Sequence, residues 1–193
     1  IDTLFNLRRQ LMQTLVSFKE DLCREDFNAI PFINADGYHS KTIAYSIWHI
    51  FRIEDIVAHT VITEDEQVFF TGNYQVRINS PIITTGNELV KQQIADFSKQ
   101  LNLEELYSYI FEVRESTEKI LERFSYDELK WKIPDERKGY LKSLNVVNCD
   151  EKAIWLIDYW CSKDIRGLIQ MPFSRHWIMH TEACLRIKNK MHS

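Results

Sequence analysis

The chain contains few of the residues that interrupt helices. Its 193 residues include only 5 Gly and 4 Pro, a low count for an all-β protein, because the many turns of such a protein need both residue types. Long uninterrupted helices tolerate this composition well. Hydrophobic residues make up 45% and charged residues 27% of the chain, an ordinary balance for a globular protein that excludes disordered and fibrous folds.

Other absences narrow the range of functions. No apolar run approaches the roughly 20 residues of a membrane helix, and the first residues lack a secretory apolar segment. The net charge is -4, and no Lys/Arg cluster with interleaved aromatics appears, so we expect no nucleic-acid surface. The 4 cysteines include no CxxC pair, and we interpret them as free thiols of a reducing compartment. The sequence therefore predicts a cytoplasmic protein without a membrane or nucleic-acid partner.

Apolar residues recur at three- and four-residue steps along most of the chain, the spacing of an amphipathic helix. This pattern predicts helices over about 4–22, 42–63, 88–101, 102–124, 150–161 and 172–190. Several polar residues precede these segments and are suited to cap them: Ser40 or Thr42, Asn102 and Asp150. No linker or internal repeat divides the chain. We therefore predict one all-α domain over residues 1–193, a four-helix bundle with additional short helices and long loops.

Three segments are less regular. Thr63–Glu66 has the pattern of a capping box that opens a short helix. The stretch 71–87 carries the β-prone piece Tyr74–Ile78 between glycines and a proline, which predicts a long loop or a minor hairpin. Asp135–Lys138 is a run of charges in an irregular region and is interpreted as a solvated loop. Long ordered loops tend to be functional.

The terminal helical segment contains His176 and His180. Two histidines four residues apart lie on one helix face with Cβ atoms roughly 6 Å apart, so both rings can reach one ion at the ~2.1 Å of a zinc–nitrogen bond. Such a pair also arises by coincidence on a solvated face. His49 lies in a largely apolar segment, where a lone histidine is more often a hydrogen-bonded core residue than a ligand. A bundle that packs these two helices together would direct all three rings into one gap.

Two tracts resemble a known family. Ile47–Asp55, which reads IWHIFRIED, and Arg175–Glu182, which reads RHWIMHTE, are similar to the second-helix and terminal-helix motifs of the DinB-like (DNA-damage-inducible protein B, or YfiT-like) superfamily. The resemblance implies a four-helix bundle with a three-histidine metal site, often found as a homodimer. On this resemblance His49 matches the second-helix ligand, and His176 and His180 match the terminal pair. The chain between the two motifs is longer than in compact members, which weakens any analogy of substrate.

The resemblance also implies a kind of chemistry. Relatives in this superfamily include bacillithiol S-transferases and a mycothiol-dependent maleylpyruvate isomerase, which use the metal to activate a low-molecular-weight thiol. Three neutral imidazoles leave one coordination position open, which is the pattern of catalytic and not of closed structural sites. We expect a divalent ion, zinc or nickel first and iron or manganese next, since imidazole suits several metals. An ion of this kind lowers the pKa of a bound water towards ~7 or binds a thiolate.

The function expected from these features is that of a metal-dependent enzyme, either a thiol S-transferase or a hydrolase. Its substrate would be a small molecule, with a low-molecular-weight thiol as one candidate. Two alternatives remain open at this point. One is a non-catalytic metal-binding stress-response protein whose helical faces mediate dimerisation. The other is a helical interaction module without metal, in which the histidines are ordinary core residues.

Residues around the three histidines are weaker candidates. Tyr45 and Arg52 lie about one turn either side of His49 and could orient a substrate or an anion, with core packing the alternative for Tyr45. His59 is turned about 80° from His49 around the helix and should miss the ion. Three carboxylates are candidates for acid–base groups or for support of the ligands: Glu54, Asp55 and Glu182. Each is turned more than about 100° from the nearby ligands, so we favour solvated positions or interhelical ion pairs for them.

Overall fold

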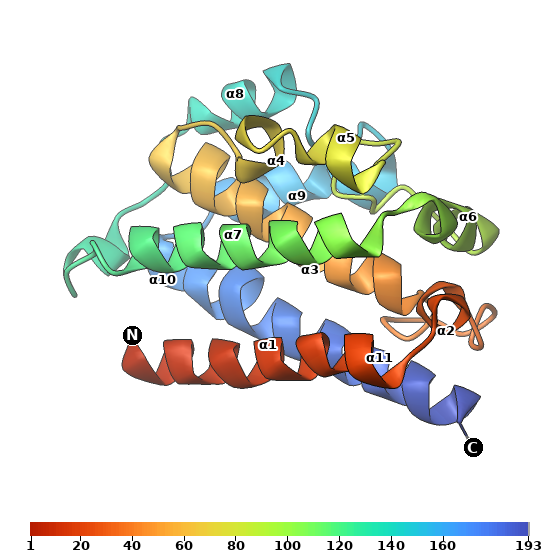
Figure 1. Ribbon diagram of the computed structural model, residues 1–193. Helices are drawn as coiled ribbons and strands as arrows, with labels where there is room; N and C mark the ends of the chain where they lie inside the picture. The colour runs from red at the N-terminus through yellow and green to blue at the C-terminus, as the bar shows by residue number, and fades with distance from the viewer. Residues whose placement is uncertain (193) are drawn as a thin grey trace.

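Helices account for all the regular structure of residues 1–192, the part of the chain that the computed structural model describes (Figure 1). The predicted all-α class is confirmed. The strand-like contact within these residues is an isolated bridge between Lys132 and Asp164. Among the helices of residues 1–192, none combines the length and the hydropathy that a membrane span requires. In chain order the helices are α1 (Asp2–Asp21), α2 (Arg24–Asn28), α3 (Ile43–Asp55), η1 (Ile56–Thr63), α4 (Val68–Thr71), α5 (Tyr74–Ile78), α6 (Gln92–Gln100), α7 (Leu103–Leu121), η2 (Glu128–Lys130), α8 (Arg137–Ser143), α9 (Glu151–Cys161), α10 (Ile165–Gln170), η3 (Met171–Arg175) and α11 (His176–Met191).

Four long helical segments form the body of the molecule: α1, α3 with its extension η1, α7 and α11 (Figure 1). The helix α3 lies in the middle and contacts both α7 and α11, while α1 packs on α11. All 13 residues of α3 are buried. This agrees with its sequence, which is apolar around much of the helix circumference and belongs in an interior.

The N-termini of α3, α7 and α9 are capped by side chains that the sequence predicts as caps. The Thr42 hydroxyl accepts a hydrogen bond from the Tyr45 backbone N–H at the start of α3. Asn102 caps α7 through its side-chain oxygen, and Asp150 caps α9 in the same manner. Each cap satisfies an N–H that has no partner inside the helix and contributes about 1 kcal/mol.

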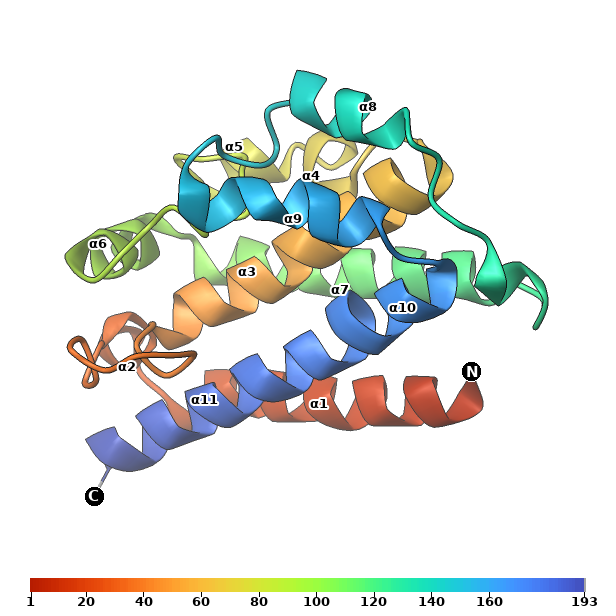
Figure 2. The same cartoon turned by 180° about the vertical axis from the view of Figure 1, so that it is seen from behind.

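The buried apolar residues form two clusters. The first, here called the bundle cluster, joins α1, the first part of α3, α6, α7 and α11, and contains Trp48 and Trp177. The second, the α9 cluster, joins the end of α3, η1, α8, α9, α10 and η3, and contains Val57 and Trp160. Figure 2 shows α9 lying across α3, with α8 outside it. The continuous segment α3–η1 therefore passes from one cluster into the other.

The predicted capping box at Thr63–Glu66 is wrong. Glu64 ends η1 in the left-handed conformation with φ 61, and the next helix, α4, begins only at Val68. The first N–H groups of α4 donate hydrogen bonds to the Asp55 carboxylate, which lies earlier in the chain. The Val68 N–H donates to Oδ1 at 2.9 Å, and the Phe69 N–H donates to Oδ2 at 2.8 Å. A tertiary partner thus replaces the local cap.

Two other local interpretations are also corrected. Tyr74–Ile78 is the short helix α5, which packs on α7 and is neither a hairpin strand nor a loop. The charged run Asp135–Lys138 is only partly solvated, because α8 begins at Arg137 and this side chain is 5% exposed. The Arg137 guanidinium donates to the backbone oxygens of Thr60 and Val61 at 2.8 and 3.0 Å. It therefore satisfies carbonyls near the end of η1.

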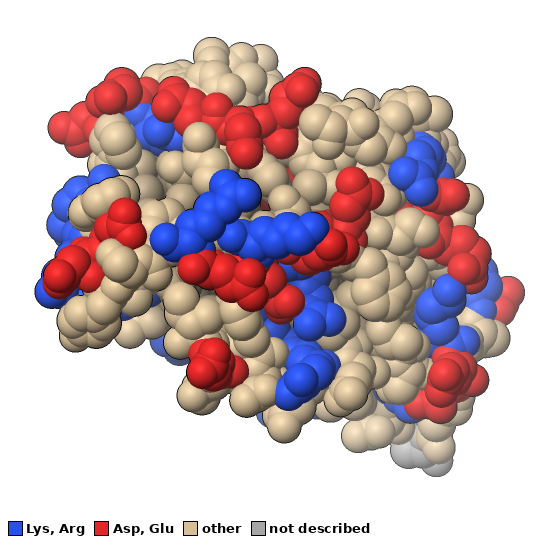
Figure 3. All heavy atoms as spheres, turned by 60° about the vertical axis from the view of Figure 1, so that its left-hand side comes forward, with Lys and Arg blue, Asp and Glu red and all other residues tan. Residues whose placement is uncertain are grey.

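Charges of both signs are mixed on the surface. On the face shown in Figure 3, Lys and Arg side chains lie among Asp and Glu, with no continuous basic area on that face. Many pairs follow helical spacing, such as Lys119 with Glu115 on α7. Exposed pairs of this kind contribute only about 0.2–1 kcal/mol each.

Candidate metal centre

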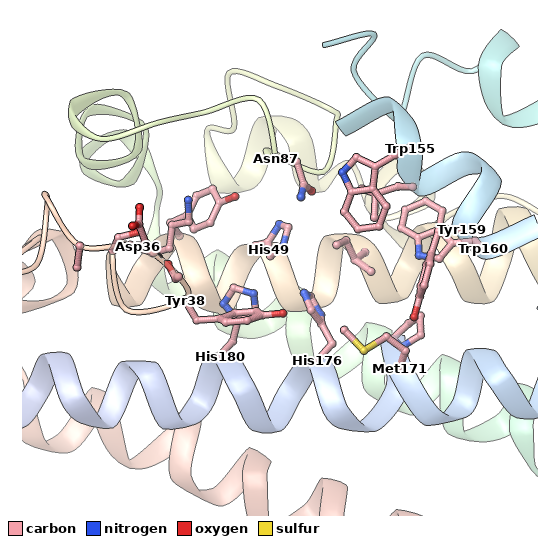
Figure 4. A pocket seen from close by; sticks show the side chains of 18 residues that line it. Asp36, Tyr38, His49, Asn87, Trp155, Tyr159, Trp160, Met171, His176 and His180 are labelled. Carbon is pink, nitrogen blue, oxygen red and sulfur yellow. Dashed lines mark hydrogen bonds between the residues drawn. The ribbon is translucent and has the colours of Figure 1, made fainter. Parts of the chain in front are cut away.

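Three histidine rings from two helices meet at one point. His49 projects from α3, and His176 and His180 project from the first turns of α11 (Figure 4). The ring centroids of His49 lie 5.1 Å from those of His176 and 4.9 Å from those of His180, and the two α11 rings are 4.6 Å apart. One donor nitrogen can be chosen from each ring so that all lie within 4.8 Å of one another. This geometry could hold a single metal ion.

The start of α11 is shaped by Pro172. Proline has no N–H to donate and its ring crowds the carbonyl four residues earlier, so it disturbs α-helical hydrogen bonding. The α-helix α10 accordingly ends at Gln170, and Met171–Arg175 form a π-helical turn that continues into His176. The sequence predicts one long terminal helix that begins at Pro172. In the structure this proline lies within the π-helical turn that precedes α11. Such turns occur often at functional sites.

The three rings are buried and electrically neutral at pH 7. Their exposed fractions are 4% for His49, 6% for His176 and 3% for His180. Burial lowers the pKa of His49 to about 4. Burial also holds the pKa of His176 and of His180 well below 6.5, and the neighbouring imidazoles add to the effect. A neutral imidazole has the free lone pair that a metal ligand needs.

The hydrogen bonds of the rings fit a bound cation. Nδ1 of His49 lies 2.6 Å from the Thr85 backbone oxygen and donates to it, which leaves Nε2 as the free acceptor. Nδ1 of His176 and Nδ1 of His180 are buried and have no hydrogen-bond partner among the described residues. Burying a polar atom without a partner costs about 1–3 kcal/mol. A shared divalent ion would offset that cost, so the residues present fit such an ion.

The loop before α6 holds His49 in place. Its Thr85 carbonyl accepts from His49, and its Gly86 carbonyl accepts from the Tyr45 hydroxyl at 2.9 Å. Tyr45 in turn stacks on His49 with ring centroids 5.2 Å apart and an interplanar angle of 12°. Gly86 has φ +77, and a Cβ there would lie 2.7 Å from a Trp48 ring carbon and 3.1 Å from one of Tyr45. Only glycine fits this position without a shift of the loop.

Replacing Gly86 with alanine is therefore expected to disturb the site and the fold together. We expect a loss of about 1–3 kcal/mol in the free energy of unfolding, from the positive φ and the close contact with Trp48. We also expect a ~10–100-fold weaker affinity for zinc, because the carbonyl that orients His49 would move. Denaturant titration measures the first quantity and chelator competition the second.

Gly139 provides the matched control. It lies within α8, and a Cβ at this position would meet nothing within 4 Å. Gly139→Ala should raise stability by up to about 1 kcal/mol, since alanine favours the helix, and leave zinc affinity unchanged. Equal zinc affinity in Gly86→Ala and the wild type would show that the loop does not orient His49.

A cavity of about 530 Å³ opens from the three histidines. One wall comes from the segment 35–41 before α3, where the Tyr38 ring meets the His180 ring edge-on at a centroid distance of 4.8 Å. The opposite wall comes from α9 and η3, with Trp155, Tyr159 and Met171 (Figure 4). The volume lies in the range of small-molecule sites, roughly 300–1,000 Å³.

The two residues expected to orient a substrate occupy different places. Tyr45 lines the cavity beside His49. Arg52 is not among the cavity-lining residues: its guanidinium donates to the Ile83 backbone oxygen at 2.8 and 3.0 Å and lies 3.6 Å from the Asp55 carboxylate. Arg52 is fully buried, so its charge serves the packing of the loop on α3.

The cavity also contains residues that sequence reasoning missed. Lys41 and Asn87 lie in irregular segments, and no periodic pattern marks them. Trp155 and Tyr159 lie on α9 but are not among its buried residues, and Trp155 is 50% exposed. The one sequence feature that could have indicated this wall of the cavity is a tryptophan outside the buried face of an amphipathic helix.

The other titratable candidates lie away from the ion position, as expected. His59 contacts Asp65 through Nδ1 at 2.7 Å and the Ser116 hydroxyl through Nε2 at 3.0 Å. This order resembles a nucleophile–base–acid relay. However, Ser116 lies inside α7, where backbone N–H groups donate within the helix and cannot stabilise an oxyanion. We therefore assign His59 to the packing of η1 on α7.

The carboxylates turned away from the ligands lie in ion pairs, of which the Glu54 pair is interhelical, as the sequence suggests. Glu54 pairs with Arg8 of α1 at 2.7 Å, with both side chains fully buried. Glu182 pairs with Arg186 one turn along the exposed side of α11. Neither lines the cavity.

Comparison of the sequence with protein-family models and with curated proteins found no match. What the fold and the geometry define is an all-α protein with a buried three-histidine cluster that could hold a metal ion beside a cavity.

Proposed function

We propose that the protein is a metal-dependent enzyme in which His49, His176 and His180 hold a divalent ion. The observation that carries this proposal is the meeting of three buried, neutral imidazoles in the wall of a cavity. Three protein ligands leave a coordination position for a substrate, as in catalytic zinc sites. Zinc and nickel are the first candidates, because imidazole binds both.

The reaction we propose is thiol S-transfer or hydrolysis of a small molecule. A bound ion would supply Lewis acidity, which activates a thiol or a water at neutral pH. The chain's own residues orient and shield: the Thr85 carbonyl sets the tautomer of His49, and Tyr45 stacks on its ring. The motifs around the three histidines, which resemble the DinB-like superfamily, favour the thiol reaction. On the same resemblance we propose a homodimer that acts in the cytoplasm.

One observation favours a second function, that of a non-catalytic metal-binding protein. Among the described residues that line the cavity, Asp36 is the only carboxylate, and it is exposed. Among these described residues, no buried carboxylate is therefore available as a general base beside the three histidines. An enzyme of this kind would depend on the substrate or on the ion for proton transfer.

Metal removal separates the possibilities. We expect untagged protein to contain about one divalent ion per chain by elemental analysis, and chelation to abolish turnover on a panel of thiol-transfer and ester substrates. Reloading with zinc or nickel should restore the turnover. A loaded but inactive protein would favour the non-catalytic function. Failure to bind any divalent ion after reconstitution would contradict both functions and leave a helical interaction module.

A further inference from the structure

The two ends of the cavity differ in chemistry. At one end lie the aromatic rings of Trp155, Tyr159 and Trp160 from α9, with Met171 of η3 beside them (Figure 4). The rings of Trp155 and Tyr159 meet edge-on at a centroid distance of 5.7 Å and an angle of 73°. Trp160 is 1% exposed and belongs to the core, whereas Trp155 is 50% exposed. A half-exposed tryptophan at a cavity wall is suited to cover a planar apolar ligand.

At the opposite end the cavity carries a cation. Lys41 is the only Lys or Arg among the described lining residues. It is partly buried, and no ion pair within 4.0 Å joins its ammonium group to a carboxylate of the described residues. The contact made by its ammonium group is with the Tyr45 ring, at 5.7 Å from the centroid. Burial lowers the pKa of Lys41, and no carboxylate counteracts this effect.

A half-buried ammonium group without a counter-ion is costly, and an anionic ligand would reduce that cost. Asp36 lies at the same end but is exposed, so water screens its charge more strongly than that of Lys41. Lys41 therefore determines the sign of the electrostatic potential at this end of the cavity. The cavity favours an anion over a cation at this end.

A third polar group lies between the two ends. Asn87 lines the cavity above His49 (Figure 4), and its buried Oδ1 has no hydrogen-bond partner among the described residues. Buried amides are normally satisfied, and the Asn87 side chain lines the cavity, so we infer that a bound molecule supplies its partner. It provides a hydrogen-bonding group for a polar atom in the middle of a bound molecule.

We propose that the cavity binds an amphipathic organic anion, with a carboxylate held by Lys41 and an aromatic body held against Trp155 and Tyr159. The molecule would pass the three histidines and the Asn87 amide between these two ends. This assignment names the substrate class of the proposed enzyme and rests on the proposed function for its catalytic meaning. The binding preference itself follows from the cavity alone.

Calorimetric titration with a matched set of probes tests the assignment. The probes are 3-phenylpropanoate, its neutral amide 3-phenylpropanamide, the cation 3-phenylpropylammonium, and butanoate, which lacks the ring. Each is titrated into metal-free and into zinc-loaded protein. For both forms of the wild type we expect the propanoate to bind at least tenfold more tightly than the amide. The ammonium probe and butanoate should bind more weakly than the amide and the propanoate, respectively.

Three variants separate the two ends of the cavity. Lys41→Met should weaken propanoate binding about tenfold and leave amide binding unchanged, which also shows that the cavity is intact. Lys41→Arg keeps the charge and should retain the preference. Trp155→Ala should weaken propanoate and amide binding by the same factor. Lys119→Met, at an exposed lysine of α7 outside the cavity, is the matched control and should change nothing.

Several outcomes would overturn the assignment. Amide or ammonium binding as tight as propanoate binding in the wild type would do so without any variant, as would the absence of binding by every probe at millimolar concentration. An acid preference that exists only with zinc and survives Lys41→Met would place the carboxylate on the ion instead. If zinc loading fails but the acid preference persists in metal-free protein, the proposed enzyme function is contradicted and the ligand assignment is supported.

Discussion

Replacing Glu54 with alanine is expected to lower the free energy of unfolding by about 3–5 kcal/mol, because it breaks a buried ion pair from one side. The Glu54 carboxylate accepts hydrogen bonds from Arg8 at 2.7 and 2.9 Å and from the Trp177 indole N–H at 2.7 Å. The Arg8 guanidinium also lies 4.4 Å from the centre of the Trp177 ring. Both charged side chains are fully buried. The variant would leave Arg8 without its main counter-ion and Trp177 without an acceptor.

Equilibrium unfolding in urea measures this effect by linear extrapolation. The matched control is Glu182→Ala, since Glu182 pairs with Arg186 on the exposed side of α11 and should change stability by no more than about 0.5 kcal/mol. The double variant Arg8→Met with Glu54→Leu should recover most of the loss, because apolar groups of similar volume replace the pair. A cost below about 1 kcal/mol for Glu54→Ala would mean that water reaches Arg8 in the folded protein.

Replacing His176 or His180 of α11 with alanine is expected to weaken zinc binding by ~100-fold or more. Loss of a group that only orients a ligand costs 10–100-fold in affinity, and loss of the ligand itself should exceed that. Because Nδ1 of His176 and Nδ1 of His180 have no hydrogen-bond partner among the described residues, the metal-free forms of His176→Ala and His180→Ala should unfold at nearly the wild-type denaturant concentration. The defect would therefore appear in metal binding and not in folding.

Thermal unfolding with and without zinc distinguishes these effects. Zinc at 100 times its dissociation constant should stabilise the wild type by about 2.7 kcal/mol and the two variants by much less. His192→Ala is the control, because His192 lies beyond the end of α11, within 3.7 Å of Asp26, and takes no part in the cluster. Identical zinc-dependent stabilisation of His176→Ala, His192→Ala and the wild type would exclude the three-histidine site.

The core of the candidate site could be predicted from the sequence, although for two different reasons. The four-residue spacing of His176 and His180 in a helix dictates that they share a face, and the structure places both on the side of α11 that meets α3. No spacing rule pairs them with His49. That association came from the resemblance of the two motifs to one family, and the structure brings the three rings together.

The surroundings of the histidines could not be predicted, because tertiary contacts decide them. Thr85 contributes a backbone oxygen, which carries no mark in the sequence. Arg52 has the spacing of a cavity residue but turns to the Ile83 carbonyl instead. Asp55 caps α4 from a distant turn, and no local pattern announces a cap of that kind. Residue type and periodicity predict which side of a helix is buried, but they do not predict which group each buried side chain contacts.

The division of the interior into two apolar clusters has a consequence for how the cavity behaves. The histidine wall of the cavity is formed by α3 and α11, and the apolar residues next to these histidines belong to the bundle cluster. The aromatic wall is formed by α9, which packs in the α9 cluster. Regions with separate cores tend to open as separate cooperative units. A molecule held by both walls would act as a cross-link between them, so that α9 could no longer loosen independently of the long helices. Ligand binding in the cavity would then rigidify α9, a helix that contributes no metal ligand.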